Sequence, residues 1–111
     1  MAGNSLSKEC LERLTKSGVT TVALAAECDR VTDIAVALGP ARLAVLRCVE
    51  HSSSDDRAAI ATMMSQRDFV WGAVLHREGG GADPLGLVES FHVDELDHLV
   101  SRLLELREAL A

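Results

Sequence analysis

The chain has 111 residues, of which 48% are hydrophobic, and carries a formal net charge of −6 at pH 7. This length fits one domain with one core, so we expect a single domain over residues 1–111. The acidic balance disfavours a nucleic-acid partner, because phosphate binding draws on clustered lysine and arginine. Lysine occurs only at Lys8 and Lys16.

Membrane, secretion and cysteine signals are all weak. No run of residues approaches the ~18 apolar positions of a membrane span, and the first ten residues lack the basic and apolar regions of a signal peptide. Cys10, Cys28 and Cys48 are an odd number, widely spaced and without a CxxC pair, so neither a disulfide framework nor a zinc site is predicted. We expect a cytoplasmic protein that has no membrane partner.

The amino-terminal half predicts a helix followed by three strands. Apolar residues recur at helical spacing from a cap at Ser5 or Ser7 to about Ser17, and Gly18 is placed to end this helix. Segments 19–28, 31–38 and 42–50 have β-branched or alternating patterns, which indicate strands. Their short connections predict an antiparallel meander, because parallel pairing needs a long crossover.

The carboxy-terminal half predicts a helix, two strands and a last helix. A serine run, Ser52 to Ser54, precedes Asp55-Asp56 and starts a second helix that reaches about Gln66. Strands follow at 69–76 and 85–92, and Asp94 is expected to cap a third helix with a long leucine stripe. The predicted fold is α+β, in the order helix, three-stranded antiparallel meander, helix, β-hairpin, helix (α-β-β-β-α-β-β-α).

The glycine run Gly79-Gly80-Gly81 has two possible roles, a phosphate cradle or a bend. A phosphate loop needs a strand before the glycines and a helix directly after them, so that backbone N–H groups face the anion. Here Ala82-Asp83-Pro84 and another strand follow, and no GK[ST] sequence is present. The glycines therefore predict the bend of a hairpin between the fourth and fifth strands.

Candidate catalytic and metal-binding residues have simpler structural explanations. His92, Asp94 and His98 lie close in sequence, and metal sites on helices use such spacing, but Asp94 is accounted for as a cap and His98 falls beside the leucine stripe. Cys28 and Cys48 lie in apolar strand patterns, whereas a nucleophile needs a histidine base and an electropositive setting. We expect no catalytic residue, no bound metal, no cofactor and no enzymatic activity.

Two features leave core packing and a subunit contact open as alternatives. Met63 and Met64 are adjacent in the second predicted helix, and methionine adapts to irregular apolar surfaces. Trp71 is of a residue type that is enriched at interface centres.

The order of elements, the acidic charge and the short length resemble the class I chaperones of type III secretion. The closest local similarity lies in HREGGGADP, LGLVESFH and DELDHLVSRLLELREAL, whereas VTTVALAAEC has fewer large residues than the family's first strand. Members of this family are small acidic homodimers that hold one secreted effector before export. The resemblance therefore implies a non-enzymatic homodimer that keeps a segment of a secreted effector polypeptide extended and soluble.

The resemblance also implies which residues would make these contacts. In the family the second helix and the strand after it form the dimer interface, which on this chain corresponds to Ile60, Met63, Met64, Val70, Trp71 and Ala73. The effector wraps around apolar patches on the first helix and the sheet, and can add a strand to a sheet edge. The corresponding residues are Leu6, Leu11, Leu14, Val22, Leu24, Ile34 and Val36.

Two alternative interpretations remain open. The first six predicted elements also resemble the PD-(D/E)XK nuclease fold, with Asp33 in place of the family's metal-binding aspartate. The E-x-K of that family would fall in the third strand, where we expect Leu46 and Cys48 instead. The carboxylate and lysine needed for metal-assisted hydrolysis are therefore missing from the pattern. The chain would then be a catalytically inactive nuclease-like subunit. The other alternative is a sensory-regulator protein of the chaperone-like fold that acts through protein–protein contacts.

Overall fold

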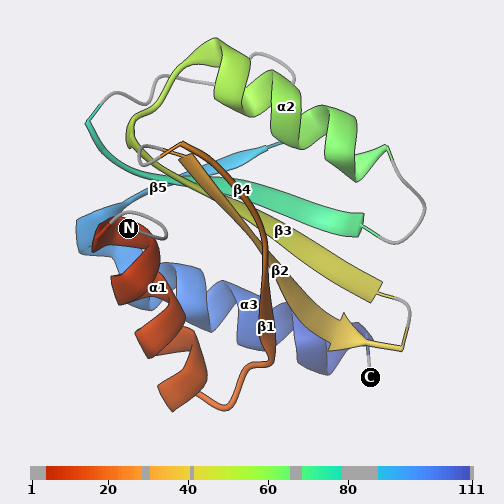
Figure 1. The fold of residues 1–111 in the computed structure, drawn as a ribbon. Coiled ribbons are helices and arrows are strands. Elements are labelled where there is room, and N and C mark those ends of the chain that lie inside the picture. The colour runs from red at the N-terminus through yellow and green to blue at the C-terminus, as the bar shows by residue number, and fades with distance from the viewer. Residues whose placement is uncertain (1–4, 29–30, 41, 66–68, 79–87, 111) are drawn as a thin grey trace.

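The computed structural model describes residues 5–28, 31–40, 42–65, 69–78 and 88–110, with side chains for all of these except residues 5 and 23–28 (Figure 1). The elements, in chain order, are α1 (Ser5–Lys16), β1 (Thr21–Cys28), β2 (Val31–Gly39), β3 (Arg42–His51), α2 (Ser54–Met64), β4 (Phe69–Glu78), β5 (Glu89–His92), a 3-10 turn η1 (Val93–Glu95) and α3 (Leu96–Leu110). The predicted α+β class and the order α-β-β-β-α-β-β-α are confirmed.

The five strands form one mixed sheet in the order β1-β2-β3-β4-β5. The first three pair antiparallel, which confirms the predicted meander. The next pair, β3 and β4, is parallel, and α2 makes the crossover between them. A parallel pair requires such a crossover because the chain must return to the same end of the sheet.

The predicted hairpin between the fourth and fifth strands is wrong. In the structure β4 and β5 run parallel, with Ala73 opposite Glu89 and His76 opposite His92. The glycine run lies in residues 79–87, outside the described residues. A bend signal alone does not determine which way the next strand runs.

The sheet separates two layers of helices: α1 and α3 lie on one face and α2 on the other (Figure 1). Because successive strand residues point to opposite faces, the central strands β3 and β4 supply both layers. The larger cluster lies under α1 and α3 and includes Leu6, Cys10, Leu14, Ile34, Val36, Leu46, Cys48, Trp71, Ala73, Leu75, Leu99 and Leu103. The smaller cluster lies under α2 and comprises Val45, Val49, Ile60, Val74 and Val88.

Two helix ends agree with the sequence analysis. Gly18 has a φ of 77°, a conformation that favours glycine, and the N–H of Val19 donates to the carbonyl of Leu14 at 3.0 Å to close the end of α1. At the start of α2, Ser53 and Asp56 form a reciprocal capping box, in which each side chain accepts from the other's backbone N–H.

The start of α3 differs from the prediction that Asp94 caps it. A 3-10 turn, η1, comes first, and its N-cap is His92, whose ring Nδ1 accepts a hydrogen bond from the N–H of Asp94 at 3.0 Å. The carboxylate of Glu95 accepts from the N–H of His92 at 3.1 Å. The turn η1 precedes α3, and this extra turn places the cap two residues earlier than the acidic pattern indicated.

Close contact between α2 and β4 depends on Gly72. A methyl group built on Gly72 would lie 2.5 Å from Cγ2 of Ile60 and 2.8 Å from Sδ of Met64. The hydrogen atom of glycine therefore leaves the space that α2 occupies against the sheet.

We expect Gly72→Ala to lower the free energy of unfolding by about 1–3 kcal/mol, because the new methyl group must push α2 away from β4. Urea unfolding followed by circular dichroism measures this change. Gly39→Ala is the matched control, since the nearest atom to its new methyl group is the carbonyl oxygen of Leu110 at 4.0 Å. Equal stability of the two variants would contradict the close packing at Gly72.

Candidate functional site

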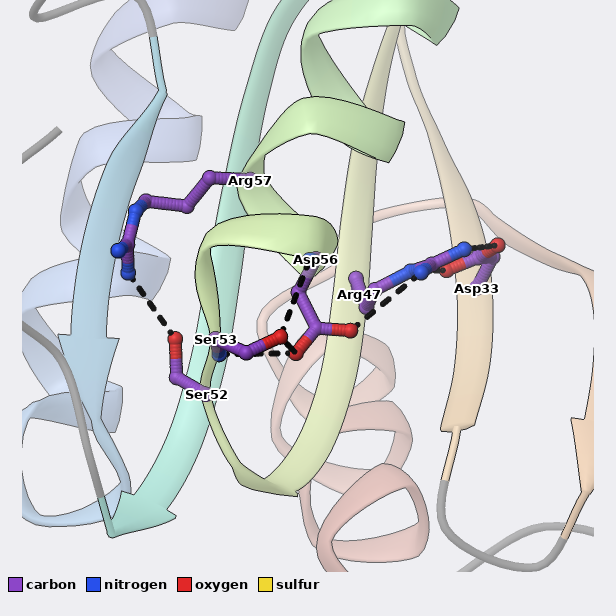
Figure 2. A network of polar contacts seen from close by, with 6 residues as sticks. All are labelled: Asp33, Arg47, Ser52, Ser53, Asp56 and Arg57. Atoms are coloured by element: carbon purple, nitrogen blue, oxygen red, sulfur yellow. Dashed lines mark hydrogen bonds and ion pairs between the residues drawn. The ribbon is translucent and has the colours of Figure 1, made fainter.

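A buried cluster of charged side chains lies on the α2 side of the sheet (Figure 2). Arg47 of β3 is directly opposite Asp33 of β2. Its Nε donates to Oδ1 of Asp33 at 2.8 Å and its Nη2 donates to Oδ2 at 3.0 Å, a two-point contact. Nη1 of Arg47 lies 3.4 Å from Oδ1 of Asp56, and all three residues are buried.

The third member, Asp56, connects this cluster to the start of α2. Its Oδ2 accepts hydrogen bonds from both the backbone N–H and the hydroxyl of Ser53, each at 3.0 Å. The hydrogen bond with Asp33 raises the pKa of Arg47, against the opposing effect of burial. One guanidinium thus joins β2, β3 and α2, three elements that are separate in the sequence.

The charges of the cluster suit a structural role. Two carboxylates share one guanidinium, and a buried charge is tolerated only when it is paired and hydrogen-bonded. Asp56 lies in the first turn of α2, where the positive end of the helix dipole stabilises a carboxylate. The polar groups of the cluster therefore satisfy one another.

The register of β2 and β3 corrects the comparison with the nuclease motif. We expected Leu46 and Cys48 at the positions of the family's E-x-K, but both side chains lie in the cluster under α1 and α3. The residues of β3 that share the face of Asp33 include Val45, Arg47 and Val49. No glutamate or lysine lies on this face of β3, so the E-x-K pattern has no counterpart there.

A hollow of about 110 Å³ lies beside the cluster. It is lined by Val31, Val49, Glu50, His51 and Asp56, and therefore lies where β3 ends and α2 begins. Its walls combine two valines with the buried carboxylate of Asp56, so it has room for water or for a small polar group.

A second polar group lies where the parallel strands β4 and β5 end. His76 is only 6% exposed, its Nε2 is 3.0 Å from the hydroxyl of Ser90, and its ring meets that of His92 edge to face at 5.9 Å. Burial lowers the pKa of His76, and the neighbouring His92 and Arg57 lower it further, while Glu95 opposes them. The lowered pKa favours the uncharged form of the His76 ring at neutral pH.

The pair formed by His76 and Ser90 was not predicted from the sequence. A hydroxyl beside a neutral histidine is the first contact that a serine nucleophile needs, but the ring must also be oriented by a third group. Among the described residues, Nδ1 of His76 has no hydrogen-bond partner. Within the described residues, the contact is thus a pair of side chains and not a triad. These residues come together because β4 and β5 pair in parallel. The sequence analysis expected an antiparallel hairpin and therefore did not predict this contact.

Three of the six predicted dimer-interface residues lie in the core, which corrects their assignment. Ile60 of α2 is buried between this helix and the sheet, whereas Trp71 and Ala73 are buried on the opposite face of the sheet, under α1 and α3. Their apolar surface packs against other residues of the same chain. The remaining three lie nearer the surface: Met63 and Met64 are half-buried, and Val70 is 41% exposed.

The predicted partner-binding residues divide in the same way. Four of them are fully buried in the cluster under α1 and α3, which overturns their assignment to a docking surface: Leu6, Leu14, Ile34 and Val36. They are covered because α1 and α3 both pack on this face of the sheet. Leu11 is half-buried, Val22 is 59% exposed, and the side chain of Leu24 in β1 lies outside the described part of the chain.

We expect acid to destabilise the chain through His76. The pKa of His76 is lower in the folded chain than in the unfolded chain, where it is about 6.5. When the pH is lowered below about 6.5, the unfolded chain binds more protons than the folded chain, so the free energy of unfolding decreases. This decrease ends once the pH is below the folded-state pKa. Urea unfolding between about pH 7.5 and pH 5 measures this slope.

His76→Gln should flatten the pH dependence, because the substitution removes the titrating ring. His98→Gln is the control, since His98 is exposed on α3 and its removal should leave the slope unchanged. An unaltered slope in His76→Gln would contradict this role of His76.

Within the described residues, no three or more side chains of His, Cys, Asp or Glu come together in a group that could hold a metal ion. The helices described lack the length and apolar character needed to cross a membrane. Comparison of the chain with protein-family models, curated proteins and solved structures gives no match. The contacts within the chain are therefore the basis for inferring its function.

Proposed function

We propose that this protein is a non-enzymatic binding protein that holds an extended segment of a partner polypeptide along the edge of β1. Strand β1 lies at one end of the sheet order, and in the described part of the chain it pairs with β2 alone. An edge strand presents a row of backbone N–H and C=O groups on which a further strand can be added. This open edge is the observation that carries the proposal.

Side chains next to this edge support the proposal. Val22 of β1 is opposite Ala35 of β2, which in turn is opposite Val45 of β3. Residues directly opposite in a sheet share a face, so an apolar row runs from the buried cluster under α2 out to the exposed Val22. An added strand would cover Val22 while it pairs with β1.

The identity of the partner follows from the resemblance in element order and charge to the class I chaperones of type III secretion. The proposed partner is a secreted effector that is kept extended in the cytoplasm before export. A second copy of the chain is also part of this proposal, because Met63, Met64 and Val70 leave apolar surface where α2 ends and β4 begins. A sensory regulator of the same fold would use the same edge for a different polypeptide.

A second candidate is a catalytically inactive nuclease-like subunit. The parallel pairing of β3 and β4 through α2, together with Asp33 and Arg47 on one face, favours this alternative. The two-point contact with Arg47 occupies the carboxylate of Asp33 that would bind metal in an active member. The net charge of −6 disfavours nucleic acid as the ligand.

We expect Val22→Lys to weaken peptide binding about tenfold or more, because it places a charge where an apolar contact forms on the open edge. The probes are peptides selected on the purified chain from a random twelve-residue library and measured by fluorescence anisotropy. Val70→Lys is the matched control: it makes the same change at another exposed valine, in β4. Because Val70 lies on the surface proposed for a second copy, this variant should lower the solution mass while the peptide affinity stays unchanged.

Amide NMR spectra locate the bound peptide and separate the two candidates. The selected peptides should shift the resonances of β1 and β2, and duplex DNA added to the same sample should shift none. Peptides that bind Val22→Lys as tightly as the unaltered chain, or that shift α2 and β5 instead, would rule out the proposed edge. Shifts induced by DNA around Asp33 and Arg47 would favour the nuclease-like alternative.

A further inference from the structure

Two thiols from distant parts of the sequence lie side by side in the core. Cys10 lies between Leu6 and Leu14 on the buried face of α1, and Cys48 lies on the face of β3 that α1 covers. Both side chains are fully buried in the same cluster, and they share a hydrogen bond. Neither is engaged in a disulfide. The functions considered above use neither thiol.

We propose that Cys10 and Cys48 form a redox-active pair that hydrogen peroxide converts into an intramolecular disulfide, which fixes α1 to β3. Sulfurs in hydrogen-bond contact need only a small movement of α1 to approach the S–S bond length of about 2.05 Å. The residues lie in different elements, so the bond would join the first helix covalently to the middle strand of the sheet.

The reaction is balanced with peroxide as the oxidant. One thiolate attacks peroxide and becomes a sulfenic acid, while the O–O bond breaks and a first water molecule forms. The sulfur of the second cysteine then attacks the sulfenic sulfur, an S–S bond forms and a second water molecule leaves. In total, two thiols lose two electrons and two protons, and one peroxide molecule is reduced to water.

The surroundings of the pair make the reaction conditional on movement of α1. The hydrogen bond with Cys10, followed by burial, raises the pKa of the Cys48 thiol, and the charge of Asp33 adds to this effect. Thiols react as thiolates, so the raised pKa makes Cys48 resist oxidation, and burial keeps peroxide away from both sulfurs while α1 is packed on the sheet. Peroxide reaches them when α1 lifts, and the disulfide then holds the helix in place after it repacks.

The test uses the folded Cys28→Ser chain, in which only Cys10 and Cys48 remain as thiols. After treatment with hydrogen peroxide, intact mass spectrometry should show the loss of two hydrogen atoms. Non-reducing peptide mapping should show one linked peptide that contains both cysteines. The solution mass should not change, dithiothreitol should reverse the reaction, and the thermal midpoint should rise by about 10 °C because the unfolded chain is cross-linked.

Cys10→Ser in the same background is the control, and it should show neither the link nor the rise in thermal midpoint. The proposal is overturned if both thiols stay free under peroxide that oxidises the denaturant-unfolded chain, or if they proceed to sulfinic acid without linking. Disulfides between chains would overturn it as well. If Cys28→Ser does not fold, the unaltered chain is mapped instead, and links through Cys28 count against the pair.

Discussion

The contact between Arg47 and its two carboxylates joins the halves of this structure. Asp33 comes from the antiparallel meander, and Asp56 comes from the helix that carries the chain over to the parallel half. A register slip of one residue between β2 and β3 would move Asp33 to the opposite face and leave the guanidinium without its two-point contact. Figure 2 shows Arg47 between Asp33 and Asp56. The cluster therefore favours one register of the sheet and one position of α2 together.

This arrangement leaves two unlike edges on the sheet. Strand β5 has four residues, and the chain continues from it directly into η1 and α3. Strand β1 has eight residues and carries the exposed Val22. Since short edge strands are poor templates for a further strand, this difference supports β1 as the edge of the proposed binding.

The sequence predicted the kind and order of the elements because periodicity, caps and turn residues are local signals. The direction of β5 is not a local property, so the glycine run led to a hairpin where the strands are parallel. The same limit explains the misplaced docking residues. Leu6 and Leu14 have the helical spacing of an apolar face, and that spacing is identical whether the face meets a partner or the chain's own sheet.

The buried cluster was missed for a related reason. Asp33 and Arg47 each interrupt an otherwise apolar strand, and two opposite charges in neighbouring strands of a meander are a detectable signal for a cross-strand pair. Asp56 was correctly placed at the start of a helix, but its contact with Arg47 depends on where α2 lies on the sheet. The pairing of Cys10 with Cys48 depends in the same way on where α1 lies.

The most direct measurement is a double-mutant cycle on the stability of the chain with Asp33→Asn, Arg47→Met and both substitutions together. Arg47→Met leaves two buried carboxylates without their cation, so we expect it to destabilise by about 3–5 kcal/mol. Asp33→Asn removes the two-point contact and leaves Arg47 with only the longer contact to Asp56, so we expect a smaller loss. The double variant should be more stable than the sum of the two losses implies, with a coupling energy of about 1–3 kcal/mol. If the loss of stability in the double variant equals the sum of the two single losses to within about 0.5 kcal/mol, the two residues act independently. This result would contradict the role given to this contact.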